Sequence, residues 1–107
     1  MMENQTQMTA DEQHRAETFG AAPDIADTLA QRGNRYGSFP GHAKITQSIK
    51  RAMQDSPNWN GLTDQQREAL EMVAHKIGRI LNGDPNYHDS WHDIVGYTKL
   101  VADELAA

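Results

Sequence analysis

Apolar residues recur at helical spacing through most of the chain, and this periodicity is what most restricts its fold. Ile45, Ile49 and Met53 lie four residues apart. Between residues 70 and 81, the apolar side chains fill one side of a helical wheel and leave the other side polar. No segment alternates apolar and polar residues with the period of two that is typical of a half-buried strand. We therefore expect an all-α fold.

Helix-terminating residues divide this pattern into three main helices and a short N-terminal one. Pro23 and Gly33 bracket the short helix, and the glycine-rich stretch 33–41 is expected to be a loop. Thr63 and Gln66 have the spacing of a capping box at the start of the third helix. Short connections favour antiparallel neighbours, as in a small helical bundle. The expected helices cover residues 24–32, 42–53, 64–81 and 89–105.

The length of 107 residues and the absence of cysteine indicate one domain without a disulfide framework. Residues 1–20 are polar and are expected to form a flexible tail or a poorly packed helix, while residues 21–107 form the helical domain. No apolar run reaches the ~18–20 residues of a membrane span, and the N-terminus lacks a signal-peptide pattern. We expect a soluble, cytoplasmic protein. Because large aliphatic side chains are few, a homo-oligomer is expected to complete the core.

Charge is distributed unevenly along the chain, which has a net charge of −5. Residues 28–56 carry five basic side chains and one acidic one. Residues 1–27 carry six acidic and one basic, and residues 83–107 carry five acidic and one basic. The acidic balance argues against general nucleic-acid or membrane-surface binding. The basic middle region is nevertheless suited to a small phosphate ligand.

Carboxylates at helical spacing are candidate metal ligands. Asp89 and Asp93 lie one turn apart, which is a suitable half-site for Mg²⁺ together with phosphate oxygens and water. Asp89 has an alternative role as a helix N-cap. The polar side of the third expected helix carries further candidates, which also fit an ordinary solvated helix surface. The candidate ligands there are Glu68, Glu71 and His75, and the same side carries Arg79, with Lys76 at its border, as candidate phosphate contacts.

Two other patterns leave alternatives open. His88 and His92 each precede an aspartate, so they are candidates for a transition-metal site or simply exposed histidines. In the stretch 33–41, Arg35 and Tyr36 would clamp a ligand's phosphate and its base or sugar. The alternative is a connecting loop whose Tyr36 and Phe39 fill the core.

The segments GNRYGSF, EMVAHKIGRI and DSWHDIVGYTKL, in this order, resemble a small phage-associated domain family of unknown function. That family is similar to the nucleotide-modification-associated domains and, remotely, to MazG-like all-α NTP pyrophosphohydrolases. The resemblance spans about residues 24–103. It implies a MazG-like helical bundle, usually oligomeric, with a nucleotide site. The matched positions are Arg35, Tyr36 and Gly37, then Lys76 and Arg79, then Asp89, Asp93, Gly96 and Tyr97.

MazG-like enzymes hold Mg²⁺ with an E-x-x-E motif on one helix and an E-x-x-D motif on the next. Glu68 and Glu71 form the first motif here, whereas Asp89 and Asp93 are four residues apart instead of three. As an enzyme, the chain would hydrolyse an NTP or a modified nucleotide to the monophosphate and pyrophosphate. Glu71, Asp89 and Asp93 would then hold Mg²⁺, with Glu68 and His75 as second choices.

Arg35, Tyr36, Gly37, Lys76, Arg79 and Tyr97 are the predicted nucleotide and phosphate contacts. The competing hypothesis is a non-catalytic phage accessory protein in the cytoplasm of a bacterial host. Such a protein would sequester a nucleotide signal or inhibit a host defence protein.

Overall fold

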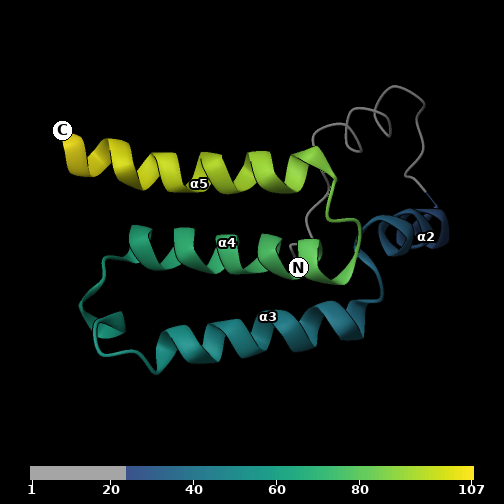
Figure 1. Ribbon diagram of the computed structural model, residues 1–107, viewed down its shortest axis with the longest axis horizontal. Helices are drawn as coiled ribbons and strands as arrows, with labels where there is room; N and C mark the ends of the chain where they lie inside the picture. The colour runs from purple at the N-terminus through teal and green to yellow at the C-terminus, as the bar shows by residue number, and fades with distance from the viewer. Residues whose placement is uncertain (1–23) are drawn as a thin grey trace. The chain divides into compact units, whose positions relative to one another are not determined.

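The computed structural model describes residues 24–107 and contains four α-helices and one short 3-10 helix in that range (Figure 1). The described residues include no strand, so the all-α prediction of three main helices after a short one is confirmed. The predicted tail, residues 1–20, lies outside the described part. The helices are α2 (Ile25–Tyr36), α3 (Phe39–Gln54), η1 (Trp59–Gly61), α4 (Asp64–Asn82) and α5 (His88–Ala106).

The chain divides into two compact units, residues 1–31 and 32–107. In the first unit, the Asp24 side chain accepts a hydrogen bond from the Ala26 amide at 2.9 Å, so it caps the start of α2. The second unit, Arg32–Ala107, contains the end of α2 and all of α3, η1, α4 and α5. Within residues 24–107, no helix has the length and apolar character needed to cross a membrane.

The predicted end of α2 at Gly33 is wrong, because the helix continues to Tyr36. Gly37 supplies the left-handed residue that ends it, with φ of 79°. The Gly37 amide donates back to the Gly33 carbonyl at 2.9 Å, as in a glycine C-cap. Gly33 and Gly37 are both residues that can end a helix, and α2 ends before Gly37.

The predicted loop over residues 33–41 shrinks to Gly37 and Ser38, because α3 begins at Phe39. Ser38 is the N-cap, and its hydroxyl accepts a hydrogen bond from the Gly41 amide at 3.2 Å. Pro40 lies in the first turn, where a helix needs no backbone donor. The proline therefore starts a helix here and does not extend a loop.

The capping box at the start of α4 is confirmed, with both reciprocal hydrogen bonds between Thr63 and Gln66 present. At the start of α5 the N-cap is Tyr87, so the N-cap interpretation of Asp89 is wrong. Asp89 lies in the first turn and accepts a hydrogen bond from the Tyr87 hydroxyl at 3.0 Å.

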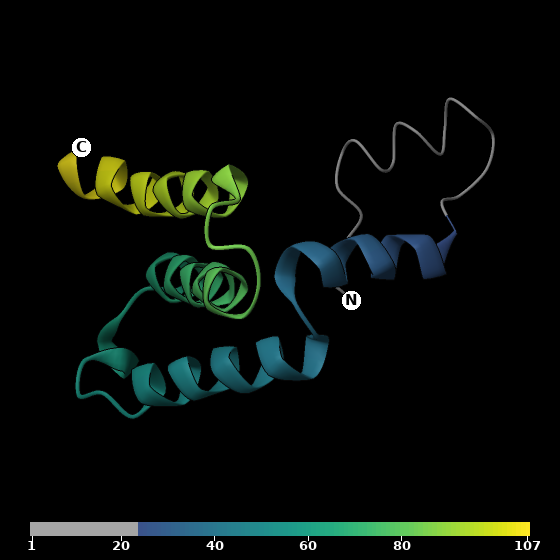
Figure 2. The ribbon, with the colours of Figure 1, turned by 45° about the vertical axis from the view of Figure 1, so that its right-hand side comes forward.

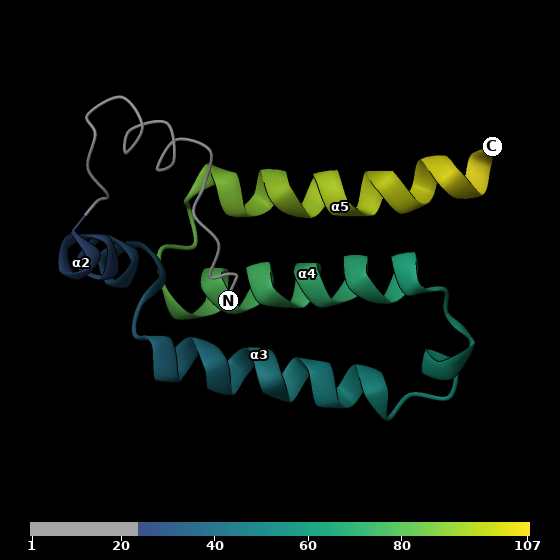
Figure 3. The same ribbon diagram turned by 180° about the vertical axis from the view of Figure 1, so that it is seen from behind.

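Helices α3, α4 and α5 lie side by side as a layer, with α4 in the middle (Figures 1 and 3). The order is unchanged when the molecule is turned (Figure 2). Gly78 allows α3 and α4 to approach closely, because a side chain there would collide with Thr46 and His42. The fully buried apolar residues of the described part are few, namely Ala69, Ala74 and Ile80.

Candidate functional site

The Asn82 side chain fixes the connection between α2 and α3 against the end of α4. Its amide nitrogen donates to the carbonyls of Tyr36, at 2.9 Å, and Ser38, at 2.8 Å. Any side chain at Gly37 would collide with Asn82, in addition to the strain of its positive φ. The role of Gly37 is therefore conformational, and it holds Arg35 and Tyr36 next to α4.

Two arginines and two tyrosines gather at this end of the layer, and we call them the Arg–Tyr cluster. The Arg35 guanidinium lies 4.4 Å from the centre of the Tyr87 ring. The Arg79 guanidinium lies 4.0 Å from the centre of the Tyr36 ring. The tyrosine rings meet edge to face, with their centres 6.0 Å apart. The end of α2 and the end of α4, more than forty residues apart in sequence, thus each contribute one cation to the same place.

The two cations differ in their surroundings. Arg35 is exposed, whereas Arg79 is partly buried, and burial lowers the pKa of its guanidinium, which still stays charged near neutral pH. Within residues 24–107, no carboxylate lies within salt-bridge distance, 4.0 Å, of either guanidinium. A guanidinium stacked on a ring keeps its N–H groups in its own plane, which is suited to a planar or tetrahedral anion. The cluster therefore holds two guanidinium groups on tyrosine rings, an arrangement whose charge is complementary to an anion.

An ion pair between α4 and α5 lies beside this cluster. The Lys76 ammonium is 2.8 Å from an Asp93 carboxylate oxygen, and the Lys76 side chain is only 12% exposed. Burial lowers the pKa of Arg79 and the charge of Asp93 opposes part of that lowering, while burial and then Asp93 raise the pKa of Tyr97. The sequence placed Lys76 at the edge of the polar side of α4, and the structure points it toward α5.

Tyr97 lies further along α5, where burial raises the pKa of its hydroxyl, as do the charges of Asp93 and Glu68. It is thus close to the ion pair and one helical turn beyond Asp93. Gly96 is exposed, and an added side chain there would meet nothing within 4 Å. No close approach in the described residues explains why Gly96 would need to be glycine.

The two predicted aspartate ligands are engaged by other partners. Asp93 pairs with Lys76, and Asp89 accepts from the Tyr87 hydroxyl and lies 3.7 Å from His88. Glu71 lies on the side of α4 that faces α3, as its helical position relative to His75 and Gly78 requires. In the part of the chain that the structure describes, no three or more His, Asp or Glu side chains are grouped to hold a metal ion.

His75, a second-choice ligand, is paired with another histidine. The His75 Nδ1 atom is 3.3 Å from Nε2 of His42, a buried residue of α3. Burial lowers the pKa of His75 to about 3, with a further contribution from Arg79. His88 and His92 stack on the exposed surface of α5, with ring centres 5.5 Å apart.

Sequence reasoning missed Asn82, Tyr87 and His42. Asn82 precedes a glycine and so indicated only a helix end. Tyr87 lies in the turn between two helices, where its neighbours gave no sign of a stacked arginine. For His42, the α-helical spacing to Thr46 and Met53 was available, since all three lie on one helix side.

The described residues thus define an all-helical protein with a cation-bearing Arg–Tyr cluster at one end of a three-helix layer. Comparison with family models, curated proteins and solved structures finds no match for the chain.

Proposed function

We propose that the chain binds a nucleotide, or another small phosphate ligand, at the Arg–Tyr cluster. The observation that carries this proposal is the pair of guanidinium groups held on tyrosine rings at 4.4 and 4.0 Å. Phosphate oxygens accept two hydrogen bonds at once from a guanidinium, and this geometry strengthens the contact. The scaffold that holds the cations is already bonded in place by Asn82. The backbone that carries Arg35 and Tyr36 is therefore already fixed in place without a ligand, which lowers the entropic cost of binding.

In the enzyme form of this proposal, the chain is a MazG-like NTP pyrophosphohydrolase. Arg35, Arg79 and Lys76 would hold the phosphates, and Asp89 and Asp93 would hold Mg²⁺, whose other ligands would be phosphate oxygens and water. The bound metal would polarise the phosphoryl group and activate water. The two aspartates fit this role in spacing and exposure, since both lie on the first two turns of α5 and neither is buried. Glu71 would have to reach past the α3 side of α4 to join them.

A non-catalytic form is favoured by the Lys76–Asp93 ion pair. The Lys76 ammonium lies 2.8 Å from the Asp93 carboxylate oxygen, so it already pairs with a group that a metal would need as a ligand. Because the Lys76 side chain is only 12% exposed, few other positions are open to it. In this form, the chain is a phage accessory protein in a bacterial cytoplasm that sequesters a nucleotide signal. The same surface would serve if the target were a host protein carrying a phosphate group.

The proposal is tested by the melting temperature of the purified chain with nucleotides, cyclic nucleotides and pyrophosphate, each with and without Mg²⁺. A ligand at ~100 times its Kd stabilises the folded state by about 2.7 kcal/mol. Arg35→Gln removes an exposed cation and should weaken binding ~10-fold or more, because a hydrogen bond to a charged group contributes about 1.5–3 kcal/mol. Arg51→Gln is the matched control, an exposed arginine on α3.

The two forms are separated by turnover. If the chain is an enzyme, Asp93→Asn abolishes release of pyrophosphate from an NTP and leaves a ligand-induced thermal shift. If the chain only binds, wild-type protein releases no pyrophosphate with Mg²⁺ or Mn²⁺ and still shows the shift. The proposal as a whole is wrong if none of these ligands raises the melting temperature, or if Arg51→Gln weakens binding as much as Arg35→Gln.

A further inference from the structure

We infer that one flat side of the three-helix layer binds a second copy of this chain. The layer has two sides, and contacts on α4 define them. His75 and Gly78 point toward α3, and Lys76 points toward α5. At about 100° per residue, Leu70 and Leu81 project between these two directions, on the side opposite Arg79. We call this side the apolar face, and it faces away from Arg79 of the Arg–Tyr cluster.

Each helix contributes apolar residues to this face. On α4, Leu70 is 40% exposed and Leu81 is 66% exposed. On α5, a row of mostly apolar residues lies next to the residues that contact α4. Its members are four, three, four and three positions apart in the sequence. That spacing is typical of a helix that pairs with another helix. The row consists of Trp91, Val95, Thr98, Ala102 and Leu105 on α5, and the face continues over Ile45, Ile49 and Ala52 on α3 and Val73 and Ile77 on α4.

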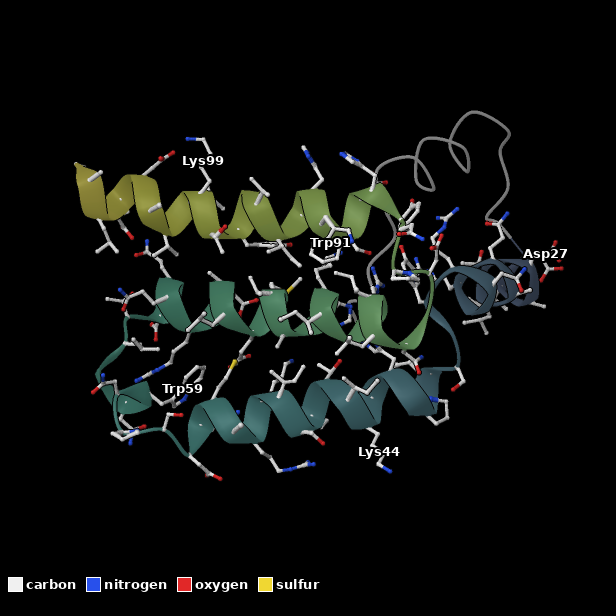
Figure 4. The ribbon with its side chains drawn as sticks, in the orientation of Figure 1. Asp27, Lys44, Trp59, Trp91 and Lys99 are labelled. Atoms are coloured by element: carbon white, nitrogen blue, oxygen red, sulfur yellow. The ribbon has the colours of Figure 1, made fainter. Side chains whose placement is uncertain are left out.

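Exposure of this face leaves the described unit with an incomplete core. Stable domains pack at least two layers of secondary structure around shared apolar residues. Here one layer is present, and Ala69, Ala74 and Ile80 are the fully buried apolar side chains among the described residues. Trp91, by contrast, is 52% exposed although it is among the largest apolar side chains of the chain (Figure 4). A second layer is therefore needed on this side.

A second copy is better suited to cover the face than the chain's own N-terminal segment. After Met1 and Met2, residues 1–23 include only Met8 and Phe19 as large apolar side chains. An identical layer supplies the full set. Three helices ~24–28 Å long with axes ~8–10 Å apart present a face on the order of 700 Å². Standard interfaces bury ~800 Å² per partner, so the face is large enough for a stable dimer.

The charges of the unit favour the same arrangement. None of the residues that form the apolar face is charged. Lys44 and Lys99 point away from α4, at the outer edges of the layer (Figure 4). A two-fold axis through the apolar face would place the apolar face of one copy on the apolar face of the other. No like charges would then come into contact. The Arg–Tyr cluster would remain accessible in both copies.

The test is the molar mass of the full chain, measured by light scattering and by sedimentation across a range of concentrations. The wild-type chain should have twice its monomer mass of 12.0 kDa at micromolar concentration. Leu81→Glu and Val95→Glu should each reduce the mass to that of the monomer, because each places a charge in the apolar face. Both positions are more than 60% exposed, so the fold of one copy should tolerate the change.

Leu100→Glu is the matched control. Leu100 is 69% exposed on the same helix as Val95, on the opposite side of the layer, and this variant should remain a dimer. Circular dichroism verifies that each variant stays helical, and the wild-type melting temperature should rise with protein concentration. A monomeric wild-type chain at all concentrations overturns the inference and favours residues 1–23 as the cover. Equal dissociation of Leu100→Glu and Val95→Glu also overturns it.

Discussion

At the scale of single residues, two histidines between α3 and α4 stabilise the fold only in their uncharged forms. His42 is buried, and its Nε2 atom lies 3.3 Å from His75 Nδ1 and 3.4 Å from the Thr46 hydroxyl. Among the described residues, His42 Nδ1 is buried without a hydrogen-bond partner. Burial lowers the pKa of both rings, and the positive charge of Arg79 lowers each further. A proton on either ring would face a second ring and a guanidinium.

Folding stability should therefore fall as the pH decreases below about 6.5. In the unfolded chain His75 takes up a proton near its usual pKa of about 6.5. In the folded chain its pKa is about 3, so between these values the unfolded state binds more protons. The stabilisation from the uncharged His75 ring is complete above pH 6.5 and is lost progressively toward pH 3, at no more than about 1.4 kcal/mol per pH unit.

Denaturant unfolding at several pH values measures this slope for the wild-type chain and for His75→Gln. The variant should lose less stability between pH 6.5 and 4, because its side chain does not titrate. His92→Gln, at an exposed histidine of α5, is the control and should follow the wild-type curve. Parallel curves for the wild type and His75→Gln would contradict the explanation.

The sequence predicts the residue types of the site better than their partners. Arg35, Tyr36, Arg79, Lys76 and Asp93 were all candidates and lie at or beside the Arg–Tyr cluster. Tyr87 was not a candidate, because a stacking contact between residues about fifty positions apart leaves no periodic signal. His75 was expected on a polar surface, since a helical wheel cannot show that α3 covers the polar side of α4 there.

At the scale of helices, the close approach of α3 to α4 depends on Gly78. Gly78→Ala should destabilise the fold by about 1–3 kcal/mol, because the added methyl group collides with Thr46 and overpacks a rigid contact. Gly96→Ala on α5 is the matched control, since its methyl group meets nothing within 4 Å. That variant should be more stable by about 0.5–1 kcal/mol, as expected for alanine in an exposed helix. Urea unfolding measures both, and equal effects would show that helix contact is not the cause.

Helix boundaries were predicted correctly where residues close in sequence determine them. They were predicted wrongly where a contact with a residue distant in sequence determines where the helix ends. The capping box of Thr63 and Gln66 involves residues three apart, and the structure reproduces it. The predicted loop over residues 33–41 failed because its glycines and proline have two consistent local readings. Asn82, more than forty residues away, bonds to the carbonyls of Tyr36 and Ser38 and so stabilises the tighter connection.

At the scale of the whole molecule, the structure of the second unit shows where the unevenly distributed charges of the sequence lie in space. The acidic C-terminal helix is paired in part with α4, which lies outside the basic region 28–56, since Lys76 of α4 lies 2.8 Å from Asp93 of α5. The cations left at the end of the layer come from α2 and α4. The distribution of charge along the chain favoured a phosphate ligand. It did not show that Arg35 and Arg79 lie close together, which only the packed structure shows.

The central position of α4 also determines how the layer comes apart. Either α3 or α5 can detach alone and leave α4 paired on its other side, whereas α4 becomes free only when both have left. Amide hydrogens of α4 should therefore exchange with solvent only through complete unfolding, while those of α3 and α5 also exchange through partial opening. Hydrogen exchange followed by mass spectrometry should show the slowest exchange in α4. Slower exchange in either outer helix would mean that this helix, and not α4, is the last element to open.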